Sequence, residues 1–319
     1  MLLDCLFIIV GVALVLWGAD RLTEGAASLA RRMSVPEIVI GLTIVAAGTS
    51  APELFVSVVS ALGGTPDLAV GNVVGSNIMN TQLIVGVTAM VAPMVISRST
   101  VFKDMPFSIL ASLLLIVLCL DTFGSLNIGG NTISRLDGVL LLAGFALFMV
   151  YTFRAAKKSK SSGQVAPQII VPVWKSLLFV VIGLACLVVG SNLFVSSASA
   201  VAEGLGVSQS VIGLTIVAGG TSLPELATSV VAARKGQSAI AIGNVIGSNV
   251  FNILLILGVT AVISPMQIGG ITIIDMAVMM GSALLLMLFS FTRFTIARWE
   301  GAVLTLCYLA YTGWLLYNI

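Results

Sequence analysis

Two copies of one long stretch of sequence decide the fold: residues 41–93 read GLTIVAAGTSAPELFVSVVSALGGTPDLAVGNVVGSNIMNTQLIVGVTAMVAP, and residues 213–265 read GLTIVAGGTSLPELATSVVAARKGQSAIAIGNVIGSNVFNILLILGVTAVISP. The copies lie 172 residues apart without a gap and share 32 of 53 positions. Each copy places one glutamate, Glu53 or Glu225, directly after a proline within apolar sequence. Because a carboxylate is costly in apolar surroundings, its duplication points to a functional site.

The composition is that of a membrane protein. Hydrophobic residues make up 58% of the 319 residues and charged residues only 9%, whereas soluble domains carry roughly 25% charged residues. The mean hydropathy is +1.14. Apolar runs long enough to cross a bilayer as helices recur along the chain. We therefore predict an all-α integral membrane protein that is in contact with the lipid bilayer along its length.

Hydrophobic periodicity predicts ten spans, five on each side of a linker at 154–173. The predicted domains are a first five-helix repeat, 1–153, and a second, 174–319. An odd number of spans per repeat makes the second copy enter from the opposite face, which is typical of transporters. We thus predict two inverted repeats with broken helices at the centre. The spans are about 2–30, 36–62, 69–92, 105–120, 136–153, 174–200, 209–233, 239–263, 270–291 and 297–317.

The basic residues predict the orientation. With the N-terminus outside, only Arg135 falls in an outer loop and Arg21 lies within the first span, while thirteen basic residues fall on the cytoplasmic side. This bias follows the positive-inside rule and predicts that both termini are outside. We interpret the lysine cluster at 157–160 as part of this signal, rather than as a lipid-recognition motif. The thirteen are Arg31, Arg32, Arg98, Lys103, Arg154, Lys157, Lys158, Lys160, Lys175, Arg234, Lys235, Arg293 and Arg298.

Several functional classes are disfavoured. The chain has no histidine, which excludes His-liganded zinc, Ser-His catalysis and a histidine proton relay. No nucleophile–base arrangement can be recognised, so we do not expect an enzyme. The cysteines lie in separate apolar runs without paired spacing, and we interpret them as packing residues. They are Cys5, Cys119, Cys186 and Cys307.

The motifs GTSAPE (48–53) and GTSLPE (220–225) predict a break in the middle of a span. Proline lacks an N–H and displaces the carbonyl of residue i−4, so Pro52 frees Gly48 and Pro224 frees Gly220. In hydrocarbon, freed carbonyls are tolerated where they line a cavity or bind a ligand. A protonated, structural carboxyl is the alternative for each glutamate, and the duplication favours the binding role.

The next span of each copy carries GNVVGSNIMN (71–80) or GNVIGSNVFN (243–252). Ser76 and Asn80 are spaced i, i+4 and share one helix face, as do Ser248 and Asn252. The glycines of this motif are explained by close helix packing. Back-bonding to the helix is the alternative for the hydroxyls, but the in-register duplication favours a site.

All of these inward candidates are hard oxygen ligands. They suit Ca²⁺, which takes six to eight oxygens, and equally Na⁺, whereas soft ligands for copper or zinc are missing. Two glutamates supply a charge of −2, which one Ca²⁺ or two Na⁺ would balance. The candidates are Glu53, Glu225, Asn80 and Asn252 with the hydroxyls of Thr49, Ser50, Ser76, Thr221, Ser222 and Ser248.

With GTSxPE followed by GSNxxN in both copies, the chain resembles the cation/Ca²⁺ exchanger family, and within it the bacterial and archaeal Na⁺/Ca²⁺ exchangers. The resemblance covers the whole chain, and the blocks 41–93 and 213–265 match the family's alpha-repeats. It implies that Glu53 and Glu225 bridge the ions, that the other eight side chains are ligands, and that Ala46 and Ala218 contribute backbone carbonyls. It also implies that the first and sixth spans slide across the other eight as a gate.

One position separates subgroups of this family. K⁺-dependent exchangers and some prokaryotic relatives carry Asp where this chain has Asn252, so the resemblance argues against K⁺ co-transport. The H⁺/Ca²⁺ branch typically shows a GNxxE-type motif in place of GTSxPE. The linker is also too short for a cytosolic Ca²⁺-sensing domain.

The sequence therefore predicts a Na⁺/Ca²⁺ antiporter of a prokaryotic inner (plasma) membrane. An H⁺/Ca²⁺ antiporter is the alternative, and a cation channel is a further one that would not need inverted halves. We expect no cofactor, no nucleic-acid partner and no obligatory protein partner. Asp20, which corresponds to Asn192 in the second half, is interpreted as interfacial, with tuning of a gate as the alternative.

Overall fold

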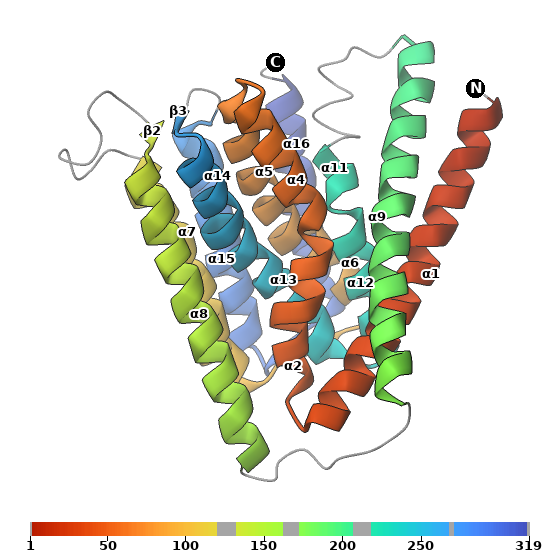
Figure 1. The fold of residues 1–319 in the computed structure, drawn as a ribbon, viewed down its shortest axis with the longest axis vertical. Coiled ribbons are helices and arrows are strands. Elements are labelled where there is room, and N and C mark those ends of the chain that lie inside the picture. Colours follow the sequence, from red (N-terminus) through yellow and green to blue (C-terminus); the bar gives the residue numbers. More distant parts are fainter. Residues whose placement is uncertain (1, 120–131, 162–171, 207–217, 268–270, 318–319) are drawn as a thin grey trace.

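The computed structural model describes residues 2–119, 132–161, 172–206, 218–267 and 271–317. Long helices dominate it (Figure 1). The first half contains α1 (Leu2–Met33), α2 (Glu37–Ile40), η1 (Gly41–Val45), α3 (Ala46–Thr49), α4 (Ala51–Leu62), α5 (Pro66–Met79), η2 (Asn80–Ile84), α6 (Val85–Val91), η3 (Thr100–Asp104), α7 (Met105–Cys119) and α8 (Arg135–Ser161), where η marks a π-helical segment.

The second half follows the same order. It contains α9 (Val173–Gly204), α11 (Ala218–Thr221), α12 (Leu223–Arg234), α13 (Ser238–Val250), η5 (Phe251–Ile256), α14 (Leu257–Ile263), α15 (Ile273–Phe291) and α16 (Arg298–Tyr317). Figure 1 shows α1 running from the upper end, where both termini lie, to the lower end, while its sequence counterpart α9 starts at the lower end and runs upward.

Seven described helices are long and apolar enough to cross a membrane, and a pair bent by 45°, Glu37–Thr49 with Ala51–Leu62, adds an eighth candidate span. The prediction of an all-helical membrane protein is confirmed. The count of ten stays a prediction, because the expected span 209–233 lies partly outside the described residues. The last expected span is α16, which has 20 residues but carries Arg298 and Glu300 and is not among the seven.

Helix boundaries differ from the prediction where charged residues continue a helix. α8 extends to Ser161, whereas the predicted span ended at residue 153, so the first part of the predicted linker is helical. Alanine and lysine, which follow the span, have high helix propensity and can continue a helix beyond the apolar region. Likewise, the predicted span 105–120 is preceded by the π-helical turn Thr100–Asp104.

Two short antiparallel strand pairs connect the halves, and the sequence did not predict them. β1 (Met94–Val95) pairs with β4 (Thr295–Ile296), and β2 (Thr132–Ile133) pairs with β3 (Met266–Gln267). Two residues are too few for a periodic signal.

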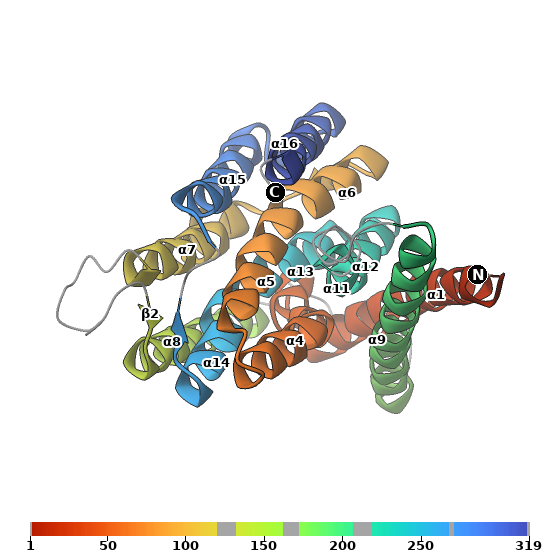
Figure 2. The same cartoon turned by 90° about the horizontal axis from the view of Figure 1, so that it is seen from above.

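The two duplicated stretches form the centre of the molecule. The spans Leu68–Val91 and Ser238–Ile263 have 78% of their most apolar windows buried, against 22% for the span in α1 and 28% for that in α9. α1 and α9 pack against each other at one end of the molecule (Figure 2). Small residues allow them to approach closely, since a Cβ at Gly18 would lie 2.8 Å from the carbonyl oxygen of Gly183.

Candidate cation-binding site

Each duplicated stretch contains an interrupted helix. In the first copy α3 ends at Thr49, Ser50 has φ −83° and ψ 7°, and α4 begins at the next residue. In the second copy Ser222 has φ −90° and ψ 7° and precedes α12. Pro52 and Pro224 lie in the first turn of the new helix, where a missing N–H has no partner to lose. The predicted interruptions are therefore present at Ser50 and Ser222.

The interruption places a glutamate at a helix N-terminus. Glu53 lies in the first turn of α4 and Glu225 in the first turn of α12. The partial positive charge at a helix N-terminus favours a carboxylate there. Both residues are only 1% exposed, so the local sequence produces two buried carboxyl groups in equivalent positions.

The two glutamates are linked across the repeats. Ser50 Oγ donates to Glu225 Oε1 at 3.1 Å, and Ser222 Oγ donates to Glu53 Oε1 at 3.2 Å. The serine at each interruption therefore binds the carboxylate of the other copy. Although these residues are about 170 positions apart in sequence, they belong to one site.

The serines of the GSN motifs join the same cluster. Ser248 Oγ donates to Glu225 Oε1 at 3.4 Å, and Ser222 Oγ lies 3.4 Å from Ser76 Oγ. Four predicted hydroxyl ligands and both predicted carboxylates are thus brought together in the interior.

The second oxygen of each carboxylate has no hydrogen-bond partner. Glu53 Oε2 and Glu225 Oε2 are both buried and unpaired, and the ion pairs found among the described residues include neither glutamate. A buried, uncompensated carboxylate is strongly unfavourable. These oxygens are therefore suited to a bound cation or a proton.

The predicted asparagine ligands show the same pattern. Asn80 Nδ2 donates to Asn249 Oδ1 at 3.1 Å, and Asn252 Nδ2 donates to Asn77 Oδ1 at 3.0 Å. The amide oxygens of Asn80 and Asn252 are buried without a partner. Since their nitrogens are held from the other copy, the oxygens remain available to a cation.

Asn77 and Asn249 are residues that sequence reasoning missed. Asn77 Nδ2 donates to the backbone oxygen of Asn249 at 3.3 Å, and Asn249 Nδ2 donates to Thr81 Oγ1 at 2.8 Å. Their identity at the same place in both GSN motifs was the available signal. The π-helical segments η2 and η5 begin shortly after these residues, at Asn80 and Phe251, and π-helical turns are frequent at functional sites.

A second asparagine pair, Asn72 and Asn244, contacts the backbone of the two glutamates. Asn72 Nδ2 lies 3.3 Å from the backbone oxygen of Glu53, and Asn244 Nδ2 lies 3.3 Å from that of Glu225. Each amide also donates to a serine one turn further along the interrupted helix, Ser57 or Ser229, at 3.1 Å. These contacts fix the first turn of α4 and α12 against α5 and α13.

The remaining hydroxyl candidates, Thr49 and Thr221, lie beside the carboxylates of the other copy, Glu225 and Glu53 respectively. Thr49 Oγ1 donates to Asn244 Oδ1 at 3.0 Å. The carbonyl of Ala46 accepts the Ser50 N–H at 3.0 Å and the Thr49 hydroxyl at 3.4 Å, so local contacts already occupy it. Thr221 is 8% exposed. Ala218 begins α11, and the role of its backbone carbonyl stays a prediction.

Side chains of α9 cover both interruptions. A Cβ added at Gly48 would overlap Leu184, and one added at Gly220 would overlap Val195. Ser191 Oγ donates to the Gly220 carbonyl at 2.5 Å, so one of the carbonyls expected to be freed by proline is bound by α9. The glycines are therefore required for α9 to approach the interrupted segments.

The arrangement suits a hard cation. Its members are carboxylate, amide and hydroxyl oxygens, and among the described residues no group of three or more His, Cys, Asp or Glu side chains forms a transition-metal site. Oxygen ligands of this kind are preferred by Ca²⁺ and other hard cations.

Comparisons with known proteins agree with this chemistry. Residues 4–154 and 175–317 match the family model described as sodium/calcium exchanger protein. The chain is 39% identical to the putative antiporter CaxA of Alkalimonas amylolytica and 33% identical to the sodium/calcium exchanger MaX1 of Methanosarcina acetivorans, over 98% of each chain in both cases.

The fold is also similar to that of a solved transporter. The sodium-calcium exchanger NCX_Mj superposes with a TM-score of 0.82 at 32% identity, over 97% of both chains. These relatives are exchangers and not enzymes. The chain is a multi-pass membrane protein and belongs to the sodium/calcium exchanger family, a branch of the cation/Ca²⁺ exchangers.

Proposed function

We propose that the protein is a secondary antiporter that exchanges Na⁺ for Ca²⁺ by alternating access. The observation that carries the proposal is the pair of crossed half-sites, in which Ser50 and Ser222 each bind the other copy's glutamate. This leaves four buried oxygens without a partner, on Glu53, Glu225, Asn80 and Asn252. Two carboxylates and two amide oxygens match the needs of a hard cation.

Charge balance explains how two ions would compete. The site contributes two carboxylates, so one Ca²⁺ or two Na⁺ neutralise it. An empty, doubly charged site would be costly to move through the low-dielectric interior. Coupling follows if the gate moves only when the site is neutralised by one ion set or the other.

The opposite course of α1 and α9 (Figure 1) supports an inverted relation between the halves, 1–153 and 174–319. Inverted repeats allow one central site to be reached alternately from each face. α9 rests on both interruptions through Leu184 and Val195, so ions gain access when α1 and α9 slide relative to the other spans. We propose the same ten-span arrangement that the sequence predicts.

The relatives support Na⁺ and Ca²⁺ as the substrates. MaX1 and NCX_Mj are both named sodium/calcium exchangers and cover nearly the whole chain. The sodium/potassium/calcium exchanger 2 of Rattus norvegicus matches only 44% of the chain. Asn at both position 80 and position 252 leaves two central acids, which disfavours K⁺ as a third ion.

Proton coupling is the second candidate. Glu53 and Glu225 each have one buried carboxylate oxygen without a partner, and a proton can neutralise a buried carboxylate as well as a metal ion can. The name of CaxA specifies no ion, so the relatives leave this candidate open. Cofactors and partner proteins are not part of the proposed mechanism.

Uptake of radioactive Ca²⁺ into proteoliposomes tests the proposal. Vesicles loaded with Na⁺ should take up Ca²⁺ faster than vesicles loaded with K⁺ or Li⁺, and Glu53→Gln and Glu225→Gln should each abolish uptake. Glu203→Gln, at the exposed end of α9, is the matched control. Uptake that is independent of internal Na⁺ but follows a proton gradient would replace Na⁺ by H⁺ in the mechanism.

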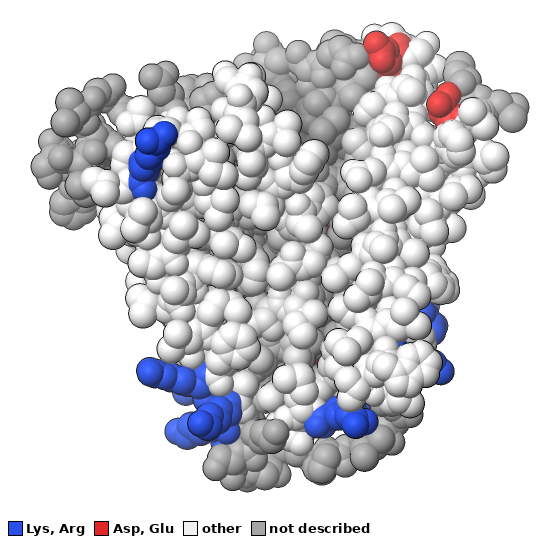
Figure 3. All heavy atoms as spheres, viewed as in Figure 1, with Lys and Arg blue, Asp and Glu red and all other residues white. Residues whose placement is uncertain are grey.

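We also propose that both termini face outward across a prokaryotic plasma membrane. On the face shown in Figure 3, Lys and Arg gather mainly at the lower end, opposite the termini, whereas the visible acidic residues lie at the upper end. This agrees with the positive-inside rule. A C-terminal reporter that is active only in the cytoplasm should stay silent, and activity would reverse the orientation.

A further inference from the structure

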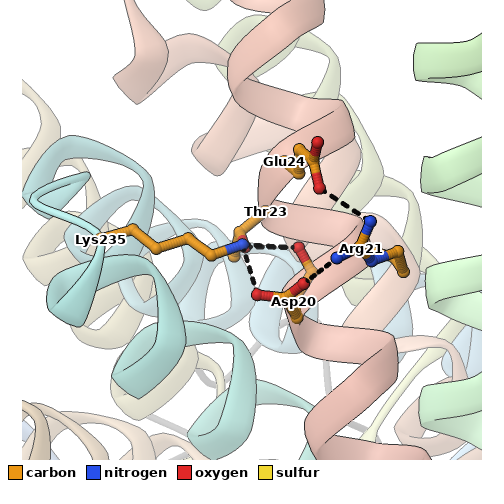
Figure 4. Close-up of polar contacts among 5 residues, drawn as sticks. All are labelled: Asp20, Arg21, Thr23, Glu24 and Lys235. Atoms are coloured by element: carbon orange, nitrogen blue, oxygen red, sulfur yellow. Dashed lines mark hydrogen bonds and ion pairs between the residues drawn. The ribbon is translucent and has the colours of Figure 1, made fainter.

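An ionic cluster joins α1 to the end of α12, outside the cation site (Figure 4). Lys235, the residue that caps the C-terminus of α12, places its Nζ 2.6 Å from Asp20 Oδ1. The same ammonium donates to the backbone oxygen of Asp20 at 2.9 Å and to Thr23 Oγ1 at 3.2 Å. An ammonium has three N–H donors, and all three find acceptors on α1.

Asp20 is held in place from its other side. Arg21 pairs with Asp20 Oδ2 at 2.5 Å and with Glu24 at 3.0 Å. The side chains of Asp20 and Lys235 are 35% and 29% exposed, so the pair is partly shielded from water. Partial shielding and several acceptors raise the strength of an ion pair above that of a fully exposed one.

The cluster connects two parts that the proposed function requires to move. α1 packs closely on α9 through Gly18 and Gly183, and Lys235 belongs to the connection between α12 and α13, which carry Glu225 and Ser248. One helical turn corresponds to about 5.4 Å, so a slide of α1 by one turn would separate Lys235 from all three acceptors.

The cluster joins the two halves, and the sequence does not repeat it at the symmetry-related positions. The positions that correspond to Asp20, Thr23 and Lys235 are Asn192, Val195 and Gly63, none of which carries a charge. In a transporter with inverted repeats, the two end states of alternating access are the conformations open to one face or to the other. They are related by exchanging the conformations of the two halves, so an energy difference between them must come from positions where the halves differ.

We infer that Asp20 and Lys235 form an ionic latch that holds α1 in the position seen here and biases the exchange cycle toward this conformation. The inference rests on the proposed alternating access. It gives Asp20 the gate-tuning role that sequence reasoning had placed second to an interfacial one. The latch makes the two end states unequal, so the resting protein favours one of them.

Hydrogen–deuterium exchange on the full chain in lipid nanodiscs tests the latch without an ion gradient. Lys235→Met and Asp20→Asn should each raise the exchange rate of the α12–α13 connection and of the lower part of α1 about three- to tenfold, because exchange follows the population of the displaced state. Arg234→Met, which removes the neighbouring cation, is the matched control and should leave the rate unchanged.

Combined variants separate the latch from general loosening. The Asp20→Asn/Lys235→Met double variant should match the single variants, because each of the three removes the ion pair between Asp20 and Lys235. The swap Asp20→Lys/Lys235→Asp should recover at least part of the protection. Additive single effects, or rates equal to those of Arg234→Met, would overturn the latch.

The readout also keeps the latch distinct from the proposed ion coupling. If Ca²⁺ uptake proved independent of Na⁺ while Lys235→Met still raised the rate of hydrogen–deuterium exchange, the latch would stand and the Na⁺ coupling would be refuted. If Ca²⁺ uptake were coupled to Na⁺ as expected, but neither Lys235→Met nor Asp20→Asn changed the rate of hydrogen–deuterium exchange, the latch alone would be refuted.

Discussion

Replacement of Asn249 by leucine should weaken Ca²⁺ binding although Asn249 is not among the predicted ligands. Its Oδ1 accepts the Asn80 amide at 3.1 Å, and its Nδ2 donates to Thr81 at 2.8 Å. The Asn249→Leu variant leaves both partners buried and unpaired, which costs about 1–3 kcal/mol each. It also frees the Asn80 amide to rotate its oxygen away from the site.

The expected loss of Ca²⁺ affinity follows because Asn249 orients the predicted ligand Asn80. Removal of a residue that orients a metal ligand typically lowers metal affinity about 10- to 100-fold, which is about 1.4–2.7 kcal/mol. Thermal unfolding of the purified protein at increasing Ca²⁺ measures this, because the stabilisation depends on the logarithm of the ratio of ligand concentration to Kd. The apparent Kd should rise, and the melting temperature without ions should fall.

Two control variants separate orientation from stability. Asn249→Asp keeps an acceptor for the Asn80 amide, so its Ca²⁺ affinity should equal or exceed that of the original protein. Asn192→Leu, at an exposed position of α9, should change neither the apparent Kd for Ca²⁺ nor the melting temperature without ions. If Asn249→Leu bound Ca²⁺ as tightly as the original protein, the role assigned to the Asn249–Asn80 contact would be wrong.

Three further predictions follow from the same geometry. Ser222→Ala removes the donor to Glu53 Oε1 and should lower the Ca²⁺ uptake rate by roughly tenfold, about 1.4 kcal/mol, while an unchanged rate would remove Ser222 from the site. Gly18→Ala places a Cβ 2.8 Å from the Gly183 carbonyl oxygen and should cost about 1–3 kcal/mol of stability, measured by thermal unfolding. The control is Gly281→Ala, which should be neutral because no atom lies within 4 Å of the new Cβ. Equal melting temperatures for the two variants would contradict the close packing of α1 on α9. Added Na⁺ should reduce the thermal stabilisation by Ca²⁺ in a competitive manner, and additive stabilisation by the two ions would place them at separate sites.

The sequence predicted which residues come together at the centre of the candidate site because its pattern is duplicated. Proline beside Glu53 and Glu225 predicted the interruptions, and the odd number of spans predicted that the copies meet. Ser50 and Ser222 then appear at the junction, each bonded to the other copy's carboxylate.

The supporting residues could not be identified in the same way. Asn77 and Asn249 are identical in both copies, but so are residues that only pack, and identity does not show which amide oxygen faces a cation. The partner of Asp20 was also hidden, because Lys235 lies 215 residues away and has no counterpart in the repeat. The strand pairs involve two residues each, which is too short for a pattern.

The crossed serines have a consequence for biogenesis. As the chain is synthesised, the first half enters the membrane before Ser222 exists, so Glu53 lacks its hydroxyl partner during that period. The first half must therefore insert with an incompletely solvated acid, which protonation would make tolerable. Assembly of the second half then supplies Ser222 and, in return, places Glu225 against Ser50. Insertion of the second half and completion of the proposed ion site are consequently a single folding event.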